Sequence, residues 1–379
     1  MTPDVTPPST SNRLLVVSHP SVLAVNQLPY EGLREHGWDP WLVVPSRWRH
    51  ELSSDDMFAP QRLPALAGRI STRRVILAGR VQRHLYATEI SRILGQVAPE
   101  IAFLEAEPTS LAAFQWGLAL HRLGIPFGVQ IAENLPRRYP AVARLVRRWS
   151  TARAAFAAAR SPAAARLLGE QAPALPTPLI PHHVPGWTEG APPAGGRPFT
   201  VGYAGRFVPE KGLDELVRAV SLIGGARARL VGNGPMLGQL REQAAAGAPI
   251  DIVTDATHDG MAAVYAGFDV LVLPSRTTRR WAEQFGRVLV EALWCGVPVI
   301  GSSSGEIPWV VESTGGGVVF PEGDVDALCR ALVELRDDPH LRSRLARSGR
   351  SAVEERFSVP AVARALSAAL RSALAGGRG

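Results

Sequence analysis

The stretch "VGYAGRFVPEKGLDELVRAV", residues 201–220, decides the fold because it joins a strand, a loop and a helix in immediate succession. The apolar run at 199–204 is typical of a strand buried on both faces, and leucines and valines then recur at helical spacing from Leu213 onward. A buried strand that runs through a short loop into an amphipathic helix indicates a parallel α/β sheet. Such sheets bind ligands at the carboxyl ends of their strands.

The loop between this strand and helix carries two cations. Lys211 is the only lysine among 41 basic residues, so the other 40 are arginines. Gly205 allows close backbone approach, Arg206 offers a planar fork for phosphate oxygens, and Lys211 offers a compact point charge. The pattern predicts a diphosphate clamp. The alternative, two solvated surface charges, stays open on this stretch alone.

Short apolar runs alternate with helical patterns along the whole chain, which predicts two α/β units. Earlier strands are expected in "RLLVVSHP", "WDPWLVVPS", "EIAFLEAEP" and "PFGVQIAEN", and later ones in "ARARLVGNG", "APIDIVTDA", "DVLVLPS", "VPVIGSS" and "GGGVVF". Helices are expected between them, as at 110–124. The predicted divisions are a disordered tail (1–11), an N-terminal domain (12–175), a Pro/Gly-rich linker (176–197), a C-terminal domain (198–358), and a crossing helix with its tail (359–379).

A second motif, "PSRTTRRWAEQFGRVLVEALWCGVPVIGS", follows the strand "VLVLP". Phe285 and Gly286 interrupt the pattern, and a helix is expected to begin near Arg287, where unpaired N–H groups offer a seat for phosphate. Glu283 lies before that helix and Glu291 on it, so the two carboxylates suit two sets of vicinal hydroxyls. The alternatives are a loop carboxylate paired with a nearby arginine for Glu283 and a helix acid complementing the dipole for Glu291.

These motifs together resemble retaining glycosyltransferases of family 4, which have the GT-B fold of two Rossmann-like domains. The chain supplies "GR…EKG", "VGNGP" (231–235) and the Glu-x7-Glu pair in the family's order, and the resemblance is strong over 199–358. It implies transfer of a hexosyl unit from a nucleotide-diphosphate sugar to a hydroxyl acceptor, with retention and without a metal or other cofactor. The last helix is expected to cross back to the N-terminal domain.

The resemblance also assigns roles to residues. Arg206 and Lys211 would bind the donor diphosphate, Glu283 the donor sugar and Glu291 the ribose. Backbone groups near the phosphates and the nucleotide complete the expected donor pocket: Gly205, Gly232, Asn233, Gly234, Phe285, Gly286, Arg287 and Val288. Glu283, Arg206 and Lys211 are the expected catalytic residues. The sugar, the nucleobase, the acceptor and the oligomeric state stay open.

The N-terminal half resembles the family less closely, and its candidates are correspondingly less specific. Residues of strand ends and following loops are candidates for acceptor or sugar contacts, each with ordinary loop capping as the alternative: His19, Asn26, Glu105, Glu107, Glu133 and Asn134. His182 and His183 fall in the predicted linker, where a hinge role and simple solvation are both open. His121 is expected to be structural.

Residues 135–160 combine apolar positions at helical spacing with arginines at 137, 138, 144, 147, 148 and 153, which predicts one basic amphipathic helix. Such a helix either lies on an anionic membrane or covers a core, and both interpretations stay open. The acidic run 324–326 is expected to cap a helix rather than bind a metal. Cys295 and Cys329 lack metal-type spacing and are expected to be buried, reduced thiols.

The composition limits the partner classes. A formal net charge of +7 favours anionic partners, and no segment reaches the roughly 20 apolar residues of a membrane span. The polar start lacks the apolar core of a signal peptide, so a cytoplasmic protein is expected, with peripheral attachment to the inner membrane face left open. Two rivals remain: another GT-B enzyme, such as an epimerase or phosphorylase, and a basic nucleic-acid-binding module. No aromatic-basic platform supports the second, so no nucleic-acid partner is expected.

Overall fold

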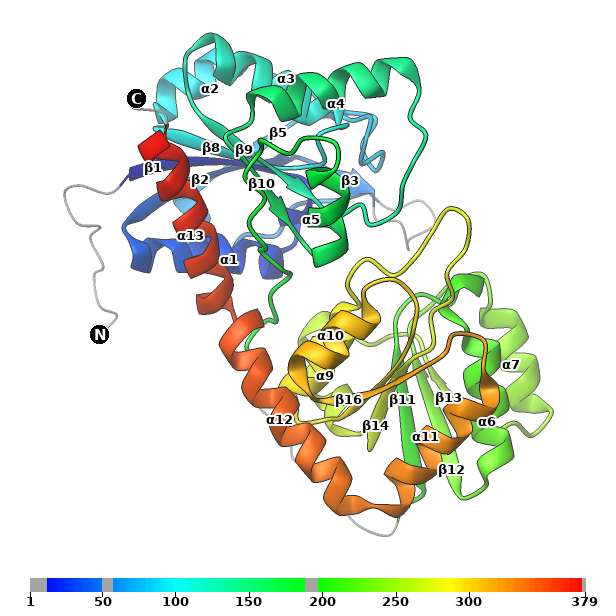
Figure 1. Cartoon of the computed structure of the whole chain (residues 1–379). Coiled ribbons are helices and arrows are strands. Elements are labelled where there is room, and N and C mark those ends of the chain that lie inside the picture. The colour runs from blue at the N-terminus through cyan, green and yellow to red at the C-terminus, as the bar shows by residue number, and fades with distance from the viewer. Residues whose placement is uncertain (1–11, 50–56, 188–196, 377–379) are drawn as a thin grey trace. The chain divides into compact units, whose positions relative to one another are not determined.

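The computed structural model describes residues 12–49, 57–187 and 197–376, and the chain divides into two compact units (Figure 1). Unit 1 comprises residues 1–183 and 359–379, and unit 2 comprises 184–358. The division at 183/184 falls inside the predicted linker 176–197. The predicted disordered tail, 1–11, lies outside the described residues.

Unit 1 is built on a six-stranded parallel sheet with the order β10-β9-β8-β1-β2-β5. Its strands are β1 (Asn12–Ser18), β2 (Trp38–Pro45), β5 (Ile70–Arg73), β8 (Ile101–Glu105), β9 (Phe127–Ile131) and β10 (Phe156–Ala159). Two small hairpins accompany it, β3 (Trp48–Arg49) with β4 (Met57–Phe58) and β6 (Val75–Ile76) with β7 (Leu85–Tyr86). Its helices are α1 (Leu28–Gly32), α2 (Ile90–Val97), α3 (Leu111–Arg122), α4 (Ala141–Arg153), α5 (Pro162–Gly169) and α13 (Val359–Gly376).

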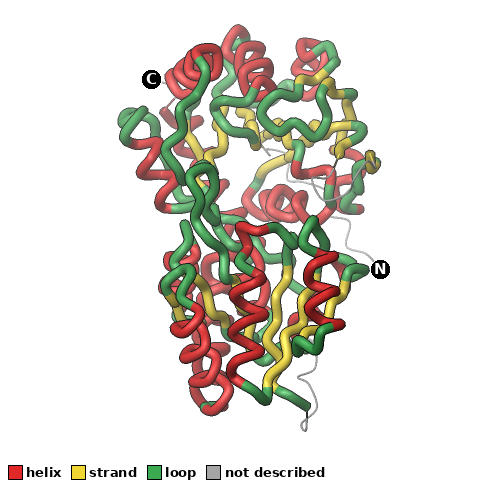
Figure 2. The backbone as a smooth tube through the Cα atoms, turned by 90° about the vertical axis from the view of Figure 1, so that its right-hand side faces the viewer, coloured by secondary structure: helices red, strands yellow, loops and turns green. Residues whose placement is uncertain are grey.

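Unit 2 repeats this architecture, and its sheet has the order β13-β12-β11-β14-β15-β16, again parallel throughout. Figure 2 shows its strands in yellow with helices in red beside them. Its strands are β11 (Phe199–Ala204), β12 (Ala226–Val231), β13 (Ile250–Val253), β14 (Val270–Leu273), β15 (Val299–Ser302) and β16 (Gly317–Phe320). Its helices are α6 (Leu213–Ile223), α7 (Leu237–Ala245), α8 (Met261–Ala266), α9 (Arg287–Trp294), α10 (Ile307–Thr314), α11 (Val325–Asp337) and α12 (Pro339–Phe357). The expected cap at the start of α11 is present, because Asp324 accepts a hydrogen bond from the Ala327 amide at 2.8 Å.

Both six-stranded sheets have the doubly wound order. In each, the first and the fourth strand of the sheet, counted along the chain, lie side by side. The chain reverses direction across the sheet at this switch point, and a crevice opens beyond the carboxyl ends of the two strands. The switch strands are β1 and β8 in unit 1 and β11 and β14 in unit 2. The sequence motifs with chemistry therefore belong to loops that open at these two switch points.

Each sheet is buried on both faces. In β1, Leu14 and Val16 pack into one apolar cluster of unit 1, while Leu15 and Val17 pack into the other. The two-residue period places alternate side chains on opposite faces, which explains why the strand reads as a continuous apolar run. Unit 2 forms its own extensive apolar cluster around β11 and β14.

The last helix, red in Figure 1, packs on unit 1, as the fold prediction required. Val362, Leu366 and Leu370 of α13 join the apolar cluster that includes residues of α1, and Trp38 Nε1 donates to Ser367 Oγ at 2.9 Å. Among the described residues, no helix combines the length and hydropathy that crossing a bilayer requires.

One segment of unit 1 departs from the sequence prediction. Residues 135–160 do not form a single helix, because α4 ends at Arg153 and β10 occupies Phe156–Ala159. Phe156 pairs with Gly128 of β9, whose missing side chain leaves room for the ring: a Cβ there would lie 2.3 Å from it. Pairing with a strand distant in sequence therefore overrides the local helical pattern.

Gly212 fixes how the loop after β11 enters α6, and this generates a stability prediction. Gly212 has φ +64°, and a Cβ on it would lie 2.0 Å from the carbonyl oxygen of Pro274, just beyond β14. We expect Gly212→Ala to lower the free energy of unfolding by more than about 3 kcal/mol, since the left-handed conformation alone costs about 1–2 kcal/mol for alanine and the backbone clash adds to it. Urea denaturation measures the difference.

Gly37 provides the matched control. It has φ +75° and ψ +26°, in the same left-handed region as Gly212, but no described atom lies within 4 Å of the position that a Cβ would occupy, so Gly37→Ala tests the conformational cost without the clash. We expect a loss of about 1 kcal/mol for this variant. Equal losses in the two variants would show that the contact with Pro274 does not constrain the loop.

Candidate functional site

The site in unit 2 begins with two glycine loops that follow β11 and β12. The Gly205 amide donates to Val231 O at 2.9 Å and the Phe207 amide to Asn233 O at 2.8 Å, so the strand pairing continues into the loops. Gly232 approaches closely, since a Cβ on it would lie 1.9 Å from Gly205 O. Backbone hydrogen bonds thus join the loops that carry "GR" and "VGNGP". Gly234 also lies against this pairing, since a Cβ on it would lie 2.5 Å from Phe207 O.

Lys211 points into unit 2 rather than into solvent. Its Nζ forms an ion pair with Glu283 Oε2, and only 13% of the lysine side chain and 11% of the glutamate side chain are exposed. Ser275 Oγ donates to the same carboxylate oxygen at 3.0 Å, and the Trp281 ring centroid lies 5.1 Å from Nζ. The interpretation of Lys211 as a solvated surface charge is therefore wrong.

Elements distant in sequence hold this pair in place. Lys211 ends a short 3-10 turn before α6, and Glu283 follows β14. The Glu306 amide donates to Glu283 O at 2.9 Å, which ties the glutamate backbone to the start of α10. Arg206 lies partly buried in the loop before Lys211, and its carbonyl accepts from Tyr203 Oη at 2.7 Å. The predicted donor residues Arg206, Lys211 and Glu283 thus lie on loops of one switch point.

The second carboxylate lies where the sequence places it. Gly286 is the left-handed N-cap of α9, which begins at Arg287 and carries Glu291 one turn later. Glu291 is 8% exposed, accepts from Tyr265 Oη at 2.6 Å, and has Arg287 Nε 3.6 Å from its Oε1. Burial, followed by the Glu291 charge, raises the pKa of Tyr265 well above its ordinary value, so the phenol stays a donor.

Aromatic groups surround Glu291. The Trp187 ring lies 5.3 Å from His258 and 6.0 Å from Tyr265, measured between centroids. Burial lowers the pKa of His258, which keeps the imidazole uncharged near neutral pH. Sequence reasoning assigned no role to four of these residues. Trp187 and Tyr265 lie outside the quoted motifs, and Ser275 and Trp281 lie inside the second motif but are neither its glutamates nor its helix start. The signal that was available is position: Ser275 and Trp281 follow a switch strand within ten residues of Glu283.

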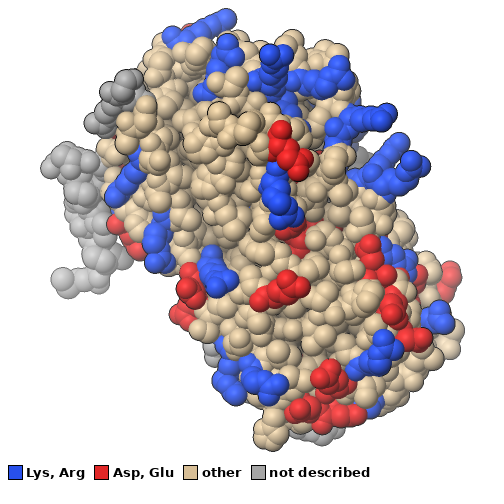
Figure 3. Space-filling view, in the orientation of Figure 1, with Lys and Arg blue, Asp and Glu red and all other residues tan. Residues whose placement is uncertain are grey.

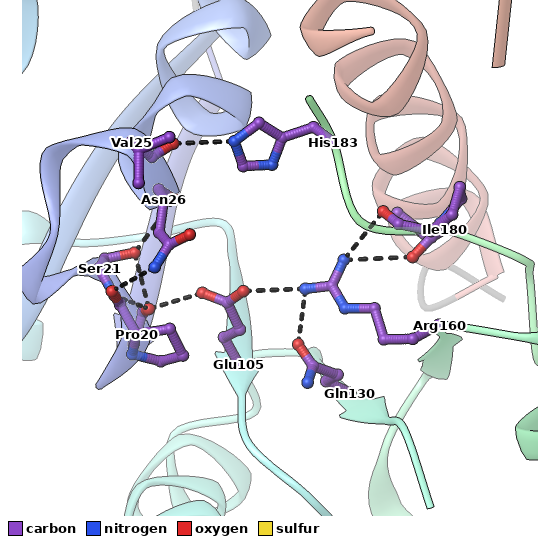
Figure 4. A network of polar contacts seen from close by, with 11 residues as sticks. Pro20, Ser21, Val25, Asn26, Glu105, Gln130, Arg160, Ile180 and His183 are labelled. Atoms are coloured by element: carbon purple, nitrogen blue, oxygen red, sulfur yellow. Dashed lines mark hydrogen bonds and ion pairs between the residues drawn. The ribbon is translucent and has the colours of Figure 1, made fainter. Parts of the chain in front are cut away.

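In unit 1, Glu105 belongs to a buried network (Figure 4). Its Oε1 lies 2.8 Å from Arg160 Nη2, and Ser18 Oγ donates to its Oε2 at 2.5 Å. Arg160 also donates to Gln130 Oε1 at 2.6 Å and to Ile180 O at 3.1 Å. Glu105 and Arg160 are only 7% and 6% exposed, so the ion pair is buried. Its contacts join the ends of β1, β8 and β10 to the segment around Ile180.

Neighbouring loops bring the other N-terminal candidates close to this network. Asn26 Nδ2 donates to Pro20 O at 2.8 Å, and His183 Nε2 lies 2.8 Å from Val25 O. His19 packs against the rings of Trp48 and His84 at 5.0 and 5.2 Å, and its buried Nδ1 has no hydrogen-bond partner among the described residues. Burial, with a smaller effect of His84, lowers the pKa of His19 to about 3, so this imidazole is neutral at physiological pH.

Glu107 and Glu133 form a second acidic group at the ends of β8 and β9. Glu107 Oε1 accepts from the amides of Ala132 at 2.7 Å and Glu133 at 3.2 Å. Burial raises the pKa of Glu107 to about 7, opposed by these hydrogen bonds and by Arg147. Glu133 pairs with Arg137, and the Leu135 amide donates to it at 3.3 Å. Asn134 adjoins this group in sequence and is partly buried.

Among the described residues, no group of three or more histidine, cysteine, aspartate or glutamate side chains is arranged to hold a metal ion. Both cysteines are free thiols, as predicted, but each is partly rather than fully buried. The groups that the site in unit 2 brings together are cations, carboxylates, backbone amides and a helix start.

The family comparison falls on the unit that contains this site. Residues 198–338 match the family model described as "Glycosyl transferases group 1". A GDP-mannose-dependent monoacylated alpha-(1-6)-phosphatidylinositol monomannoside mannosyltransferase of Corynebacterium glutamicum is 34% identical over 160 residues, 40% of this chain and 42% of that protein. A 2-deoxystreptamine N-acetyl-D-glucosaminyltransferase of Streptomyces fradiae is 33% identical over 180 residues, 45% and 41% of the two chains. The matches thus span less than half the length of these relatives.

The structural comparison covers both units. Sucrose-phosphate synthase from Thermosynechococcus elongatus superposes with a TM-score of 0.72 at 19% identity, covering 96% of this chain and 100% of that one. At this identity the likeness concerns the fold alone. It confirms the two-domain GT-B architecture predicted from the sequence.

The raised pKa of Glu107 predicts a pH effect on stability. Between the ordinary carboxyl pKa of 4.5 and the folded value of about 7, the folded protein keeps a proton that the unfolded chain loses. The free energy of unfolding contributed by Glu107 is therefore highest at low pH and falls as pH rises to about 7. We therefore expect the free energy of unfolding of Glu107→Gln, relative to that of the parent, to rise by about 2 kcal/mol as pH increases from 5 to 8. Urea denaturation at a series of pH values measures this difference.

Glu89→Gln, at an exposed carboxylate of the same unit, is the control and is expected to show no such trend. A pH-independent difference between Glu107→Gln and the parent would contradict the prediction.

Proposed function

We propose that this chain, whose residues 198–338 form a domain of the glycosyl transferases group 1 family, transfers a hexosyl unit from a nucleotide-diphosphate sugar to a hydroxyl acceptor. The transfer would retain the anomeric configuration and need no metal ion. The observation that carries the proposal is the buried Lys211–Glu283 pair beside Arg206 at the switch point of unit 2. The relatives described above, whose names specify GDP-mannose and 2-deoxystreptamine, support the donor and acceptor classes.

In the proposed mechanism, Arg206, Lys211 and the start of α9 stabilise the charge that develops on the leaving diphosphate. Preorganised cations and helix N-termini lower the barrier most when they face developing charge in a site shielded from water. Glu283 would accept hydrogen bonds from hydroxyl groups of the donor sugar, and Glu291 from the ribose. The leaving diphosphate would help to deprotonate the acceptor hydroxyl as it attacks from the same face.

The ion pair gives donor binding a specific consequence. Lys211 is held by Glu283 and Ser275 Oγ contacts the same carboxylate, so in the free protein the ammonium and carboxylate satisfy each other. A diphosphate that approaches Lys211 and a sugar that approaches Glu283 would replace this interaction from both sides. Only a ligand with both parts gives the ammonium a negatively charged partner and the carboxylate hydroxyl donors at the same time. This favours an intact nucleotide sugar over free sugar or free phosphate.

Donor binding is tested by thermal shift against UDP-, GDP-, ADP- and dTDP-sugars. A donor at 100 times its dissociation constant should stabilise the protein by about 2.7 kcal/mol. We expect Glu291→Ala and Arg206→Ala to abolish this shift, each measured against its own melting temperature without ligand. Glu312→Ala on the exposed side of α10 and Arg227→Ala, which pairs with Asp251 at the surface, are matched controls that should keep it. A full shift in either site variant would place the donor elsewhere.

Lys211 is tested by Lys211→Arg. The ammonium is enclosed by Glu283, Ser275 and Trp281, and a wider guanidinium with fixed donor directions cannot replace a point charge there. We expect kcat/KM with the selected donor to fall by about tenfold to a hundredfold. Arg227→Lys, at an exposed pair, should leave it unchanged. Full turnover in Lys211→Arg would mean that the site needs only a positive charge.

A further inference from the structure

A hollow of about 630 Å³ lies on unit 1 between α4, the loop before it and the end of α5. Five of its ten lining residues are arginines, and none is an aspartate or glutamate. We call it the arginine pocket, after Arg137, Arg138, Arg144, Arg147 and Arg148. It belongs wholly to unit 1, so it is separate from the donor site on unit 2.

The arginines of the pocket are poorly neutralised by the protein. Arg137 pairs with Glu133, but among the described residues no ion pair joins Arg138, Arg144, Arg147 or Arg148 to a carboxylate. Arg144 Nη1 donates to the carbonyl of Tyr139 at 3.3 Å, and the Arg147 guanidinium lies over the Tyr139 ring, 5.4 Å from its centroid. Five arginines that converge around a single ion-paired carboxylate repel one another, and a bound anion relieves that repulsion.

Arg147 adds an independent indication. Its Nη2 is buried and has no hydrogen-bond partner among the described residues. A buried guanidinium nitrogen without an acceptor is costly, and native structures supply a partner to nearly all such groups. The described neighbours supply no acceptor to it: the guanidinium lies over the Tyr139 ring, and the nearby Glu107 carboxylate accepts from the amides of Ala132 and Glu133.

A second hollow, of about 640 Å³ on unit 2, is also lined by arginines, but there the protein supplies partners for two of them. It contains Arg342, Arg347 and Arg350, but also Asp269 and Glu354. Arg342 Nη1 donates to Arg336 O at 2.8 Å, and Arg350 donates to Trp294 O while its guanidinium lies 4.2 Å from the Trp294 ring centroid. Arg342 and Arg350 thus pack and cap backbone carbonyls, and two carboxylates lie among the lining residues.

The surface view agrees with this contrast. Figure 3 shows basic side chains gathered over the upper part of unit 1, with few acidic ones among them, whereas both signs are interspersed on unit 2. The same unit exposes two apolar side chains of α4, Val142 and Leu145, each 69% exposed. The apolar stripe predicted for this helix is thus divided, since Val146 is buried while Val142 and Leu145 face solvent.

We propose that the arginine pocket binds a phosphate group. Guanidinium forks bind phosphate oxygens bidentately and are weakly hydrated, so several around one hollow suit a multivalent oxyanion better than a monovalent one. The phosphate belongs either to a small soluble anion or to a lipid head group. Val142 and Leu145 distinguish these sources, because only a lipid surface offers apolar contacts to exposed side chains beside a phosphate.

The test compares two double variants with equal loss of charge. Arg144→Gln with Arg148→Gln removes two exposed arginines of the pocket, and Arg344→Gln with Arg347→Gln removes two from the surface of α12. Each is titrated with inorganic phosphate at constant ionic strength, followed by thermal shift, and sedimented with phosphatidylcholine vesicles with and without phosphatidic acid. Neither double variant changes the predicted donor site of unit 2. Any phosphate bound at that site therefore affects the thermal shift of both variants equally.

We expect the pocket variant to weaken at least one of the two interactions about tenfold and the α12 variant to keep both. If the loss concerns vesicles, and Val142→Ser with Leu145→Ser repeats it, the ligand is a lipid phosphate. If the loss concerns inorganic phosphate and vesicles do not bind, the ligand is a soluble phosphate. Equal behaviour of the two double variants in both arms would overturn the proposal, since net charge alone would then explain binding.

Arg147→Lys separates the fork from the charge. It keeps the positive charge but replaces the planar guanidinium, with its several N–H donors, by a single ammonium group. We expect it to weaken the same interaction about threefold to tenfold. Unchanged binding in Arg147→Lys would contradict the role given to the buried nitrogen.

Discussion

The contact between Gly212 and the carbonyl of Pro274 constrains the whole site in unit 2. It brings the loop after β11 against the chain as it leaves β14, at a separation that admits no side chain. Lys211 precedes this contact and Ser275 follows it, so the two reach the same carboxylate of Glu283. The doubly wound strand order makes β11 and β14 neighbours, and the glycine sets how close their loops come.

The sequence could predict the residues of this site but not their pairing. Strand, loop and helix were readable from local periodicity, and α9 begins at Arg287 as expected. Lys211 and Glu283 are 72 residues apart, however, and each had nearer charged neighbours as plausible partners. Their ion pair depends on which strands adjoin in the sheet, and a single sequence carries no direct record of that order.

The same limit explains the error around β10. The residues after Arg153 are alanine-rich and have helical propensity, yet they form a strand because Gly128 of β9 accommodates Phe156. Local preference amounts to a few tenths of a kcal/mol per residue, which is less than burying an aromatic side chain between sheet and helix contributes. Prediction fails where a distant partner contributes more than the local pattern.

Glu105 and Glu107 show how one short stretch can contain two kinds of carboxylate. Glu105 is the last residue of β8 and Glu107 lies two residues beyond it, and the residue type does not distinguish them in the sequence. Glu105 faces Arg160 and Ser18, so its charge is compensated and it serves to join strands. Glu107 meets backbone amides and a more distant guanidinium, which do not offset its burial, and its pKa rises to about 7. A carboxyl that changes charge near neutral pH is suited to exchange protons or hydrogen bonds with a ligand, whereas one locked in an ion pair is not. Arg160, just after β10, is the ion-pair partner of Glu105, so the strand that the local pattern failed to predict positions this partner.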